Sequence, residues 1–193
     1  MQTIRTFIAI PLTKAIEKPA IRLITRLQSP DDAIKWVPTD NLHLTLKFLG
    51  DVDNVELPKI CDTIRRVCRS TEPFTLEFGG TGGFPETQRP RVLYCGIQGE
   101  TKTLCELVSS LEKQLADLGF KQEPRDYRPH LTLGRTRSSS RRANDDVVAR
   151  LHAENDVDLG AMRVESVQVI ASFLDKSGPT YNVIDTIDLG DDT

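Results

Sequence analysis

The sequence predicts an α+β protein of two similar lobes built on antiparallel sheets. In each half of the chain, apolar residues switch between the two-residue period of strands and the 3.6-residue period of helices. The connections are short and the chain ends in a hairpin pattern, and both features favour antiparallel pairing. The tetrapeptide HLTL occurs at 43–46 and again at 130–133, which indicates an internal repeat.

The first half of the chain predicts two amphipathic helices between strands. One helix is expected over 14–28, where Pro19 should kink or restart it, and the other over 56–69. Gly50 and Asp51 should end the strand that carries the first HLTL. The glycine-rich run 79–85 lacks the lysine and the spacing of a P-loop, so we expect a flexible connection between strands. The expected strands are 5–12, 34–37, 42–49 and 74–78.

The second half predicts a similar succession of elements. The apolar residues of 101–118 form the clearest helical stripe in the chain, and Gly119 fits its C-terminal cap. Pro129 precedes the strand that carries the second HLTL, and a polar loop over 138–142 leads to a short surface helix over 144–152. The remaining expected strands are 92–97 and a hairpin of 164–173 and 181–189 around a turn at 176–179.

The size and composition are those of an ordinary globular domain. Of the 193 residues, 38% are hydrophobic and 27% are charged, and we expect residues 1–193 to form one domain of two packed lobes, a monomer by default. No apolar run approaches the roughly 20 residues that span a bilayer, and no signal peptide is evident, so we expect a cytoplasmic protein without a membrane partner. The four cysteines lack CxxC spacing, which favours reduced thiols over disulfides or zinc.

Charge is unevenly distributed along the chain. The net charge of −3 argues against a protein that coats nucleic acid non-specifically. Between residues 121 and 142, seven basic residues stand against two acidic ones and enclose the second HLTL. Such runs are often only solvated surface, but this one adjoins a candidate site. The basic residues are Lys121, Arg125, Arg128, Arg135, Arg137, Arg141 and Arg142.

The two HLTL segments hold two of the three histidines of the chain. Because alternate side chains of a strand share a face, His43 shares a face with Thr45, and His130 shares a face with Thr132. The leucines of each motif fall on the opposite face. The sequence therefore predicts two strands that each present a histidine and a threonine together.

Strict alternation also assigns the rest of the first motif strand. Lys47 would share the face of His43, and Phe48 would share the face of the leucines. The third histidine, His152, lies in the predicted surface helix, where no polar partner is suggested. We expect it to be solvated or to have a packing role.

The repeated motif has several interpretations. Coincidence is disfavoured because the threonine and both leucines recur with the histidine. Structural histidines would not explain why the neighbours are duplicated. A metal site would need further ligands, and neither motif supplies HxH, HExxH or a carboxylate on the same face. We therefore expect neither a metal nor a cofactor.

Paired histidines can perform acid–base chemistry at phosphorus. Near neutral pH, one imidazole can take a proton from water while the other, protonated, donates a proton to the departing oxygen. Threonine hydroxyls and a nearby arginine can bind the non-bridging oxygens. If the repeat brings the two strands together across a cleft, the chain is predicted to be a phosphoesterase.

Longer stretches around the motifs resemble those of the RNA 2',3'-cyclic phosphodiesterases, formerly called 2'-5' RNA ligases, of the two-histidine phosphoesterase superfamily. The resemblance covers essentially the whole chain. It implies a bilobed α+β fold with outer helices, related by a pseudo-twofold, and a positively lined active-site cleft between the lobes. It rests on RTFIAIPL near the N-terminus, NLHLTLKFLGDV, RPHLTLGRTR, and the terminal VIASFL and GPTY.

The resemblance also implies an activity and residue roles. The activity is metal-independent hydrolysis of an RNA 2',3'-cyclic phosphate end, or of a nucleotide 2',3'-cyclic phosphate, to a 2'-phosphate, with a weak reverse 2'-5' ligation. By position, His43 resembles the proton donor and His130 the proton acceptor, and the labels exchange when the reaction reverses. Thr45 and Thr132 match the second polar residues of the motifs, and Arg135 matches an arginine that binds phosphate.

Two other functions remain open. One is a nucleotide-binding module of the same fold with weak or no turnover. The other is a phosphodiesterase of the same superfamily that acts on small cyclic nucleotides, oligoadenylates or a tRNA-splicing intermediate. Further residues could line the cleft or belong instead to the core or a solvated loop: Trp36, Tyr94 or Phe7 for base stacking, and Arg137, Arg141 and Arg142 for the RNA backbone.

Overall fold

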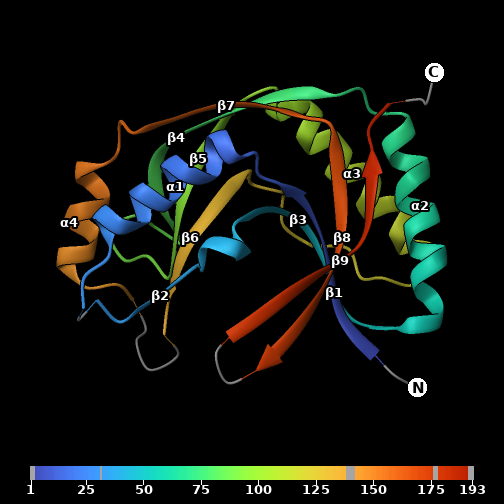
Figure 1. Ribbon diagram of the computed structural model, residues 1–193, viewed down its shortest axis with the longest axis horizontal. Helices are drawn as coiled ribbons and strands as arrows, with labels where there is room; N and C mark the ends of the chain where they lie inside the picture. The colour runs from blue at the N-terminus through green and yellow to red at the C-terminus, as the bar shows by residue number, and fades with distance from the viewer. Residues whose placement is uncertain (1–2, 31, 138–141, 176–177, 191–193) are drawn as a thin grey trace.

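The computed structural model describes residues 3–30, 32–137, 142–175 and 178–190. Within them the chain forms four α-helices and two antiparallel sheets, which confirms the predicted α+β class (Figure 1). The predicted loop residues 138–141, with Arg141, and the turn residues 176–177 lie outside this part. No helix in the described ranges is long and apolar enough to cross a membrane. The helices are α1 (Lys14–Leu27), α2 (Leu57–Arg69), α3 (Thr101–Ala116) and α4 (Asp145–Ala153).

The strands form a four-stranded sheet in the order β3-β1-β8-β9 and a five-stranded sheet in the order β2-β6-β5-β4-β7. The two HLTL segments begin β3 and β6, and these two strands contact each other where the sheets meet. Each motif strand pairs with the strand that precedes it across a helix, β3 with β1 and β6 with β5. The strands are β1 (Thr3–Pro11), β2 (Ile34–Trp36), β3 (His43–Asp53), β4 (Phe74–Phe84), β5 (Val92–Gly99), β6 (His130–Thr136), β7 (Asp158–Val164), β8 (Ser166–Asp175) and β9 (Gly178–Asp188).

Each sheet is covered by one helix from each half of the chain. Helix α1 follows β1 of the four-stranded sheet but packs against β7 of the other sheet and against α4. Helix α3 follows β5 of the five-stranded sheet but packs against β3 and α2. Figure 1 shows the pairs α1–α4 and α2–α3 on opposite sides of the molecule. Each helix pair therefore combines one helix from the N-terminal half of the chain with one from the C-terminal half, and the two halves interlock.

The predicted helix faces are confirmed by burial. Helix α1 continues through Pro19 as one element. Helix α3 ends where Gly119 adopts a φ of 92°, and the amide of Phe120 donates to the carbonyl of Leu115 at 3.1 Å. A fully buried leucine or isoleucine side chain contributes roughly 1.5–3 kcal/mol. The buried face of α1 consists of Ile16, Ala20, Leu23, Ile24 and Leu27, all pointing into the core.

Two predictions about strands are wrong, and one strand was missed. Strand β3 does not end at Gly50 but continues to Asp53, and Gly50 adopts a φ of 78° that glycine tolerates. The run 79–85 is not a flexible connection, because β4 extends to Phe84 and pairs there with β5. Strand β7 was not predicted, because its seven residues show no clear alternation between apolar and polar side chains.

The glycines of β4 have a packing role. Gly82 lies opposite Tyr94 of β5, and a Cβ atom at Gly82 would sit 2.5 Å from the Tyr94 hydroxyl oxygen. The ring of Tyr94 can therefore lie across the strand only because residue 82 has no side chain. This close approach explains a glycine inside a strand, where glycine is otherwise unfavourable.

One-residue bulges interrupt the pairing of β3 with β1 at Leu46 and at Leu49, and the first lies inside the motif. Ile8 lies opposite Lys47 and Ala9 lies opposite Thr45, which leaves Leu46 without a partner in register. A bulge exchanges the two faces of a strand beyond it.

The same bulge occurs in the second motif strand. In the pairing of β6 with β5, Leu93 lies opposite Gly134 and Tyr94 lies opposite Thr132, which leaves Leu133 without a partner. Leu133 is the fourth residue of its HLTL, as Leu46 is of the first. In both strands the fifth residue after the histidine therefore turns to the histidine face.

The predicted faces of Lys47 and Phe48 are consequently wrong. Phe48 turns to the face of His43, and Lys47 turns towards α3, where its side chain is 4% exposed. Its Nζ donates to Glu112 Oε2 at 2.6 Å and to the carbonyl oxygen of Lys121 at 3.0 Å. This ion pair fastens a motif strand from the first half of the chain to a helix from the second half.

We expect Lys47→Met to lower the free energy of unfolding by about 3 kcal/mol, because it leaves the carboxylate of Glu112 largely buried without its partner. The double variant Lys47→Met/Glu112→Leu should recover much of this loss, because it leaves no unpaired charge. Urea unfolding measures both effects.

The matched control for this variant is Lys102→Met. Lys102 faces Glu106 at 3.8 Å on the exposed surface of α3, and an exposed pair of this kind contributes at most about 1 kcal/mol. Equal effects of Lys47→Met and Lys102→Met would contradict a structural role for the buried pair.

Candidate active site

His43 and His130 make the same backbone hydrogen bond. Each is the first residue of its strand, and its Nδ1 lies 2.7 Å from the carbonyl oxygen two residues earlier, that of Asn41 or of Arg128. A carbonyl oxygen can only accept, so Nδ1 carries the proton. In neither histidine does Nε2 have a hydrogen-bond partner among the described residues. Both imidazoles are thus held in one tautomer with Nε2 free for chemistry.

Aromatic rings pack against His43. The centroid of its ring lies 4.8 Å from that of Phe7 and 5.4 Å from that of Tyr181. The short helix η1 (Thr39–Asn41) supplies the carbonyl acceptor, and the side-chain amide of Asn41 donates to the carbonyl of Pro179 at 2.8 Å. Strand β9 therefore both contacts the imidazole and holds the turn that orients it.

Aromatic rings also pack against His130. Its centroid lies 4.9 Å from that of Phe84 and 5.6 Å from that of Tyr94, and these two rings stack on each other at 4.5 Å. The guanidinium carbon of Arg128 lies 4.7 Å from the centroid of Phe84 on the ring face. Two rings beside each imidazole restrict its motion and exclude water from part of its surface.

The strands next to β3 and β6 repeat the same register. The first, third and sixth residues counted from each histidine lie opposite every second residue of the neighbouring strand, because of the shared bulge. The pairs are His43 with Pro11, Thr45 with Ala9 and Phe48 with Phe7 in one sheet, and His130 with Gly96, Thr132 with Tyr94 and Arg135 with Val92 in the other.

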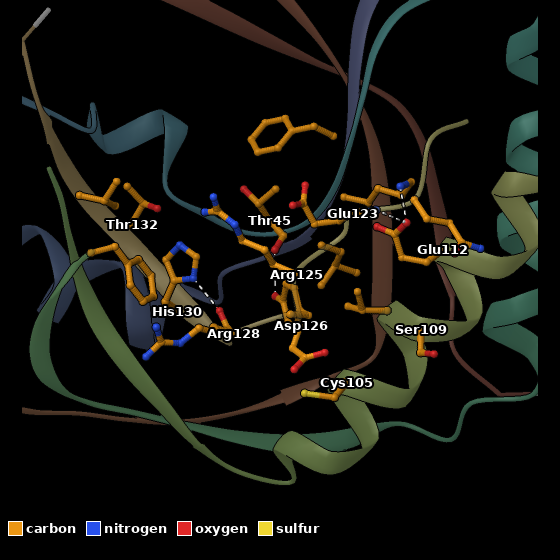
Figure 2. Close-up of a pocket in the computed structure, with 18 of the residues that line it drawn as sticks. Thr45, Cys105, Ser109, Glu112, Glu123, Arg125, Asp126, Arg128, His130 and Thr132 are labelled. Carbon is orange, nitrogen blue, oxygen red and sulfur yellow. Dashed lines mark hydrogen bonds and ion pairs between the residues drawn. The ribbon is translucent and has the colours of Figure 1, made fainter. Parts of the chain in front are cut away.

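A cavity of about 1300 Å³ adjoins the second motif and reaches the first (Figure 2). Thr45, His130, Thr132 and Arg135 line it, and His43 does not. Figure 2 shows His130 and Thr132 on one side of the cavity and the α3 residues on another, with Thr45 between them. The structure thus brings four of the five predicted site residues to one cavity.

Tyr181 packs against His43 and is influenced by the charge of Arg135, which lines the cavity. Burial raises the pKa of Tyr181, and the positive charges of Arg135 and Arg5 oppose this rise. Arg135 therefore lies close enough to act on Tyr181, which packs against His43, and it also acts electrostatically on His130. His43 is therefore related to the cavity residue Arg135 through Tyr181, and it does not itself line the cavity.

The predicted phosphate-binding groups that face the cavity have no hydrogen bond or ion pair with other described side chains. Among the described residues, neither the hydroxyl of Thr45 nor that of Thr132 has a hydrogen-bond partner, and the guanidinium of Arg135 has no ion pair. Free donors that converge on a cavity can bind an anion without first breaking other hydrogen bonds. These hydroxyls and this guanidinium are therefore available to bind the oxygens of a negatively charged group.

Basic side chains outnumber acidic ones around the cavity. The predicted basic stretch contributes Lys121, Arg125, Arg128 and Arg135, whereas Arg137 and Arg142 do not line the cavity. Glu112 is already paired with Lys47. Arg91 and Lys113 were not predicted here, because they reach the cavity only through the packing of β5 and α3. The other acidic lining residues are Glu123 and Asp126.

The two histidines differ in electrostatic environment. Burial lowers the pKa of His43, and the hydrogen bond to Asn41 opposes this effect. Burial also lowers the pKa of His130; its hydrogen bond to the Arg128 carbonyl opposes this, while the charges of Arg135 and Arg128 lower it further. Among the described residues, no cationic side chain acts on His43 in this way.

The other residues considered from the sequence have different positions. Trp36 is half-buried against the core, its indole nitrogen donates to Asp32 Oδ2 at 2.8 Å, and it does not line the cavity. Phe7 is 2% exposed and offers no free stacking face. Tyr94 belongs to the ring pair beside His130. His152 is exposed on α4 and does not line the cavity.

The sequence missed Tyr181, Phe84 and Phe48. The first two come from distant strands and have no local signal. Phe48 could have been found by its spacing, because it follows His43 by the same five residues as Arg135 follows His130. As to metals, the described ranges contain no cluster of three or more His, Cys, Asp or Glu side chains that could hold an ion.

Comparisons with known proteins agree with this geometry. A family model described as the 2'-5' RNA ligase superfamily matches residues 15–172. An RNA 2',3'-cyclic phosphodiesterase of Methanothermobacter thermautotrophicus is 37% identical over 179 residues, covering 92% of this chain and 95% of that protein. A protein of the same name from Aquifex aeolicus is 27% identical over 191 residues, covering 98% and 100%.

Solved structures share the fold. The crystal structure of a Thermus thermophilus protein has a TM-score of 0.80 at 27% identity, covering 98% of this chain and 100% of that one. The LigT protein of Escherichia coli in complex with 3'-AMP has a TM-score of 0.76 at 25% identity, covering 97% and 98%. Because the family model spans most of the chain and both motifs, the chain belongs to the 2'-5' RNA ligase superfamily.

Proposed function

We propose that this chain hydrolyses RNA ends that carry a 2',3'-cyclic phosphate to 2'-phosphomonoesters, without a metal, by acid–base catalysis between His43 and His130. The proposal rests on one observation above all: both imidazoles have the same fixed tautomer with a free Nε2, beside a free threonine hydroxyl. The names of the relatives from M. thermautotrophicus and A. aeolicus support the choice of substrate. Residues 1–193 would act as one two-lobed domain, and as a monomer.

The reaction needs one proton acceptor and one proton donor. Nε2 of His130 takes a proton from water, and the water oxygen attacks phosphorus. The bond from phosphorus to the ribose 3' oxygen then breaks, and the protonated Nε2 of His43 donates its proton to that oxygen. The product is a 2'-phosphate, and exchange with solvent restores the starting protonation of both imidazoles. The same sequence of steps, with a 5' hydroxyl in place of water, would form a 2'-5' linkage and release the 3' hydroxyl.

Thr45, Thr132 and Arg135 stabilise the charge that develops during this reaction. The two hydroxyls donate hydrogen bonds to non-bridging oxygens, and the guanidinium binds the same oxygens through charge-assisted bonds. Their freedom from other partners among the described residues supports this role.

The charges around the two histidines support the assignment of donor and acceptor. Arg128 and Arg135 favour the neutral form of His130, which suits a residue that must accept a proton. Among the described residues, no cationic side chain lowers the pKa of His43. Binding of an anionic phosphate would therefore raise its pKa without opposition from a nearby positive charge and would keep it protonated. This asymmetry supports His43 as donor and His130 as acceptor.

The direct test incubates the purified protein, in EDTA, with an RNA that ends in a 2',3'-cyclic phosphate. We expect turnover and a product with a 2'-phosphate end, identified by digestion of the RNA to nucleotides and comparison of the terminal nucleotide with 2'- and 3'-monophosphate standards. Absence of turnover would favour a nucleotide-binding module, and inhibition by EDTA would indicate a metal site. A 3'-phosphate product would contradict the choice of leaving oxygen.

We expect His43→Ala and His130→Ala each to lower kcat/KM by about 10²- to 10⁴-fold, the usual contribution of a positioned acid or base. His152→Ala is the matched control, because this histidine is exposed on α4, and it should leave kcat/KM unchanged. Near-full activity of either motif variant would show that its imidazole is not an acid–base catalyst.

The lowered pKa values of both histidines predict an acidic optimum. Because His130 must be neutral and His43 protonated in the free enzyme, kcat/KM should follow a bell-shaped pH profile. Both limbs should lie at or below about 6.5, the ordinary imidazole pKa. A profile that is flat from pH 5 to 8 would contradict the acid–base pair.

Arg128→Gln tests the acceptor assignment through the direction in which the pH profile moves. Removal of this positive charge should raise the pKa of His130, so the acidic limb of the profile should move to higher pH. Histidine signals in an NMR titration should show the shift at His130 and not at His43. The control Arg137→Gln removes an exposed charge that does not act on His130, and should leave both pKa values unchanged.

A further inference from the structure

One tyrosine side chain joins the two motifs. The hydroxyl of Tyr127, three residues before His130, donates to the carbonyl oxygen of Thr45 at 2.9 Å. Tyr127 belongs to the segment 120–129, which leads from α3 to β6 without forming a helix or a strand and which we call the strap. The lead-in to the second motif is thus bonded to the backbone of the first motif, and the proposed chemistry does not use this bond.

The environment of Tyr127 keeps this hydrogen bond in place. Its ring is half-buried and packed against the core, and the residue lines the cavity that Thr45 and His130 also line. Burial raises the pKa of the Tyr127 hydroxyl, so the hydroxyl stays protonated wherever a histidine titrates. The acceptor belongs to β3, an outer strand of its sheet, and such a strand has backbone groups that no neighbouring strand satisfies.

Only two residues separate Tyr127 from His130. The first, Arg128, provides the carbonyl oxygen that accepts from Nδ1 of His130 at 2.7 Å. The second is Pro129, whose ring fixes its own φ and restricts Arg128 to extended conformations. A short and stiff piece of backbone therefore connects the Tyr127 side chain to the carbonyl that orients the imidazole.

The lead-ins to the two histidines are held in different ways. The turn before His43 is tied by the Asn41 amide to β9, a strand of the same sheet. The strap before His130 is tied by Tyr127 to Thr45, which belongs to the sheet of the other motif. The first bond fixes an imidazole within its own sheet, whereas the second fixes an imidazole relative to the opposite motif.

We infer that Tyr127 is a positioning residue that sets the place and orientation of the His130 imidazole relative to the first motif. This inference rests on the proposed function for the role of His130 as proton acceptor. Strand β3 is paired with β1 along its length, and the other hydrogen bonds from the strap to β3 and α3 lie at its far end, at Lys121 and Glu123. Loss of the Tyr127 hydroxyl should therefore release the part of the strap next to His130.

The test is Tyr127→Phe, which removes one oxygen atom and keeps the ring. We expect kcat for an RNA with a 2',3'-cyclic phosphate end to fall by about 10- to 100-fold, because a small misplacement of a catalytic group is enough to cost that much. KM should change little, because the groups proposed to bind the phosphate, Thr45, Thr132 and Arg135, are all retained. An unchanged kcat would overturn the inference.

Thr81→Val is the matched control. The Thr81 hydroxyl donates to the carbonyl of Leu151, so it also joins segments far apart in the sequence, but Thr81 does not line the cavity. Its loss should leave kcat unchanged. An equal fall of kcat in Thr81→Val and Tyr127→Phe would show a general effect of lost hydrogen bonds and would count against a positioning role.

The same substitution in a protein that already carries His130→Ala separates positioning from folding. If Tyr127 acts through His130, Tyr127→Phe should not lower the residual kcat of His130→Ala any further. If Tyr127→Phe only reduced the folded fraction, it would lower kcat by the same factor with and without His130, and the inference would be wrong.

Nitrogen-15 chemical shifts of the imidazoles separate this inference from the proposed reaction, because they need no turnover. At about pH 8, where both imidazoles are neutral, wild-type His130 should show the Nδ1–H tautomer that the Arg128 carbonyl selects. Tyr127→Phe should let the Nε2–H tautomer appear at His130 and not at His43, which would support the inference even if no cyclic phosphate were hydrolysed. An unchanged tautomer at His130 would overturn it even if hydrolysis were observed.

Discussion

The bulge at the fourth residue of each HLTL determines which side chains can act together. Before Leu46 and Leu133 the histidine and threonine share a face by simple alternation, and beyond them the faces exchange. This exchange brings Arg135 to the cavity and sends Lys47 into the interior beside Glu112. Without it the residue facing the cavity would be Gly134, which carries no charged side chain. A local irregularity of pairing thus completes the site.

The interlocked helices hold the two motif strands in a fixed relation. Because α1 and α3 each cross to the sheet of the other half, separating the lobes would expose apolar faces of both helices. The Lys47–Glu112 pair adds a polar tie between β3 and α3. The proposed acid–base catalysis requires two imidazoles at a constant separation, and a fold in which each half covers the other would favour it.

Much of this arrangement was predictable from local patterns. The helical stripes, the cap at Gly119 and the shared face of each histidine and threonine follow from side-chain periodicity, which is a property of the chain itself. The bulges were not predictable from one strand, because a bulge is defined by the partner strand. The glycines of β4 were misread for the same reason, since only the ring of Tyr94 across the sheet explains Gly82. The rings around both imidazoles come from strands far apart in sequence.

The most direct test of the paired imidazoles is the double variant His43→Ala/His130→Ala, compared with each single variant by kcat/KM. If the two residues work as a unit, loss of one already disables the proton transfer that the other completes. The double variant should then be about as slow as the slower single variant. A double variant slowed by the product of the two single effects would show independent contributions and would contradict the account.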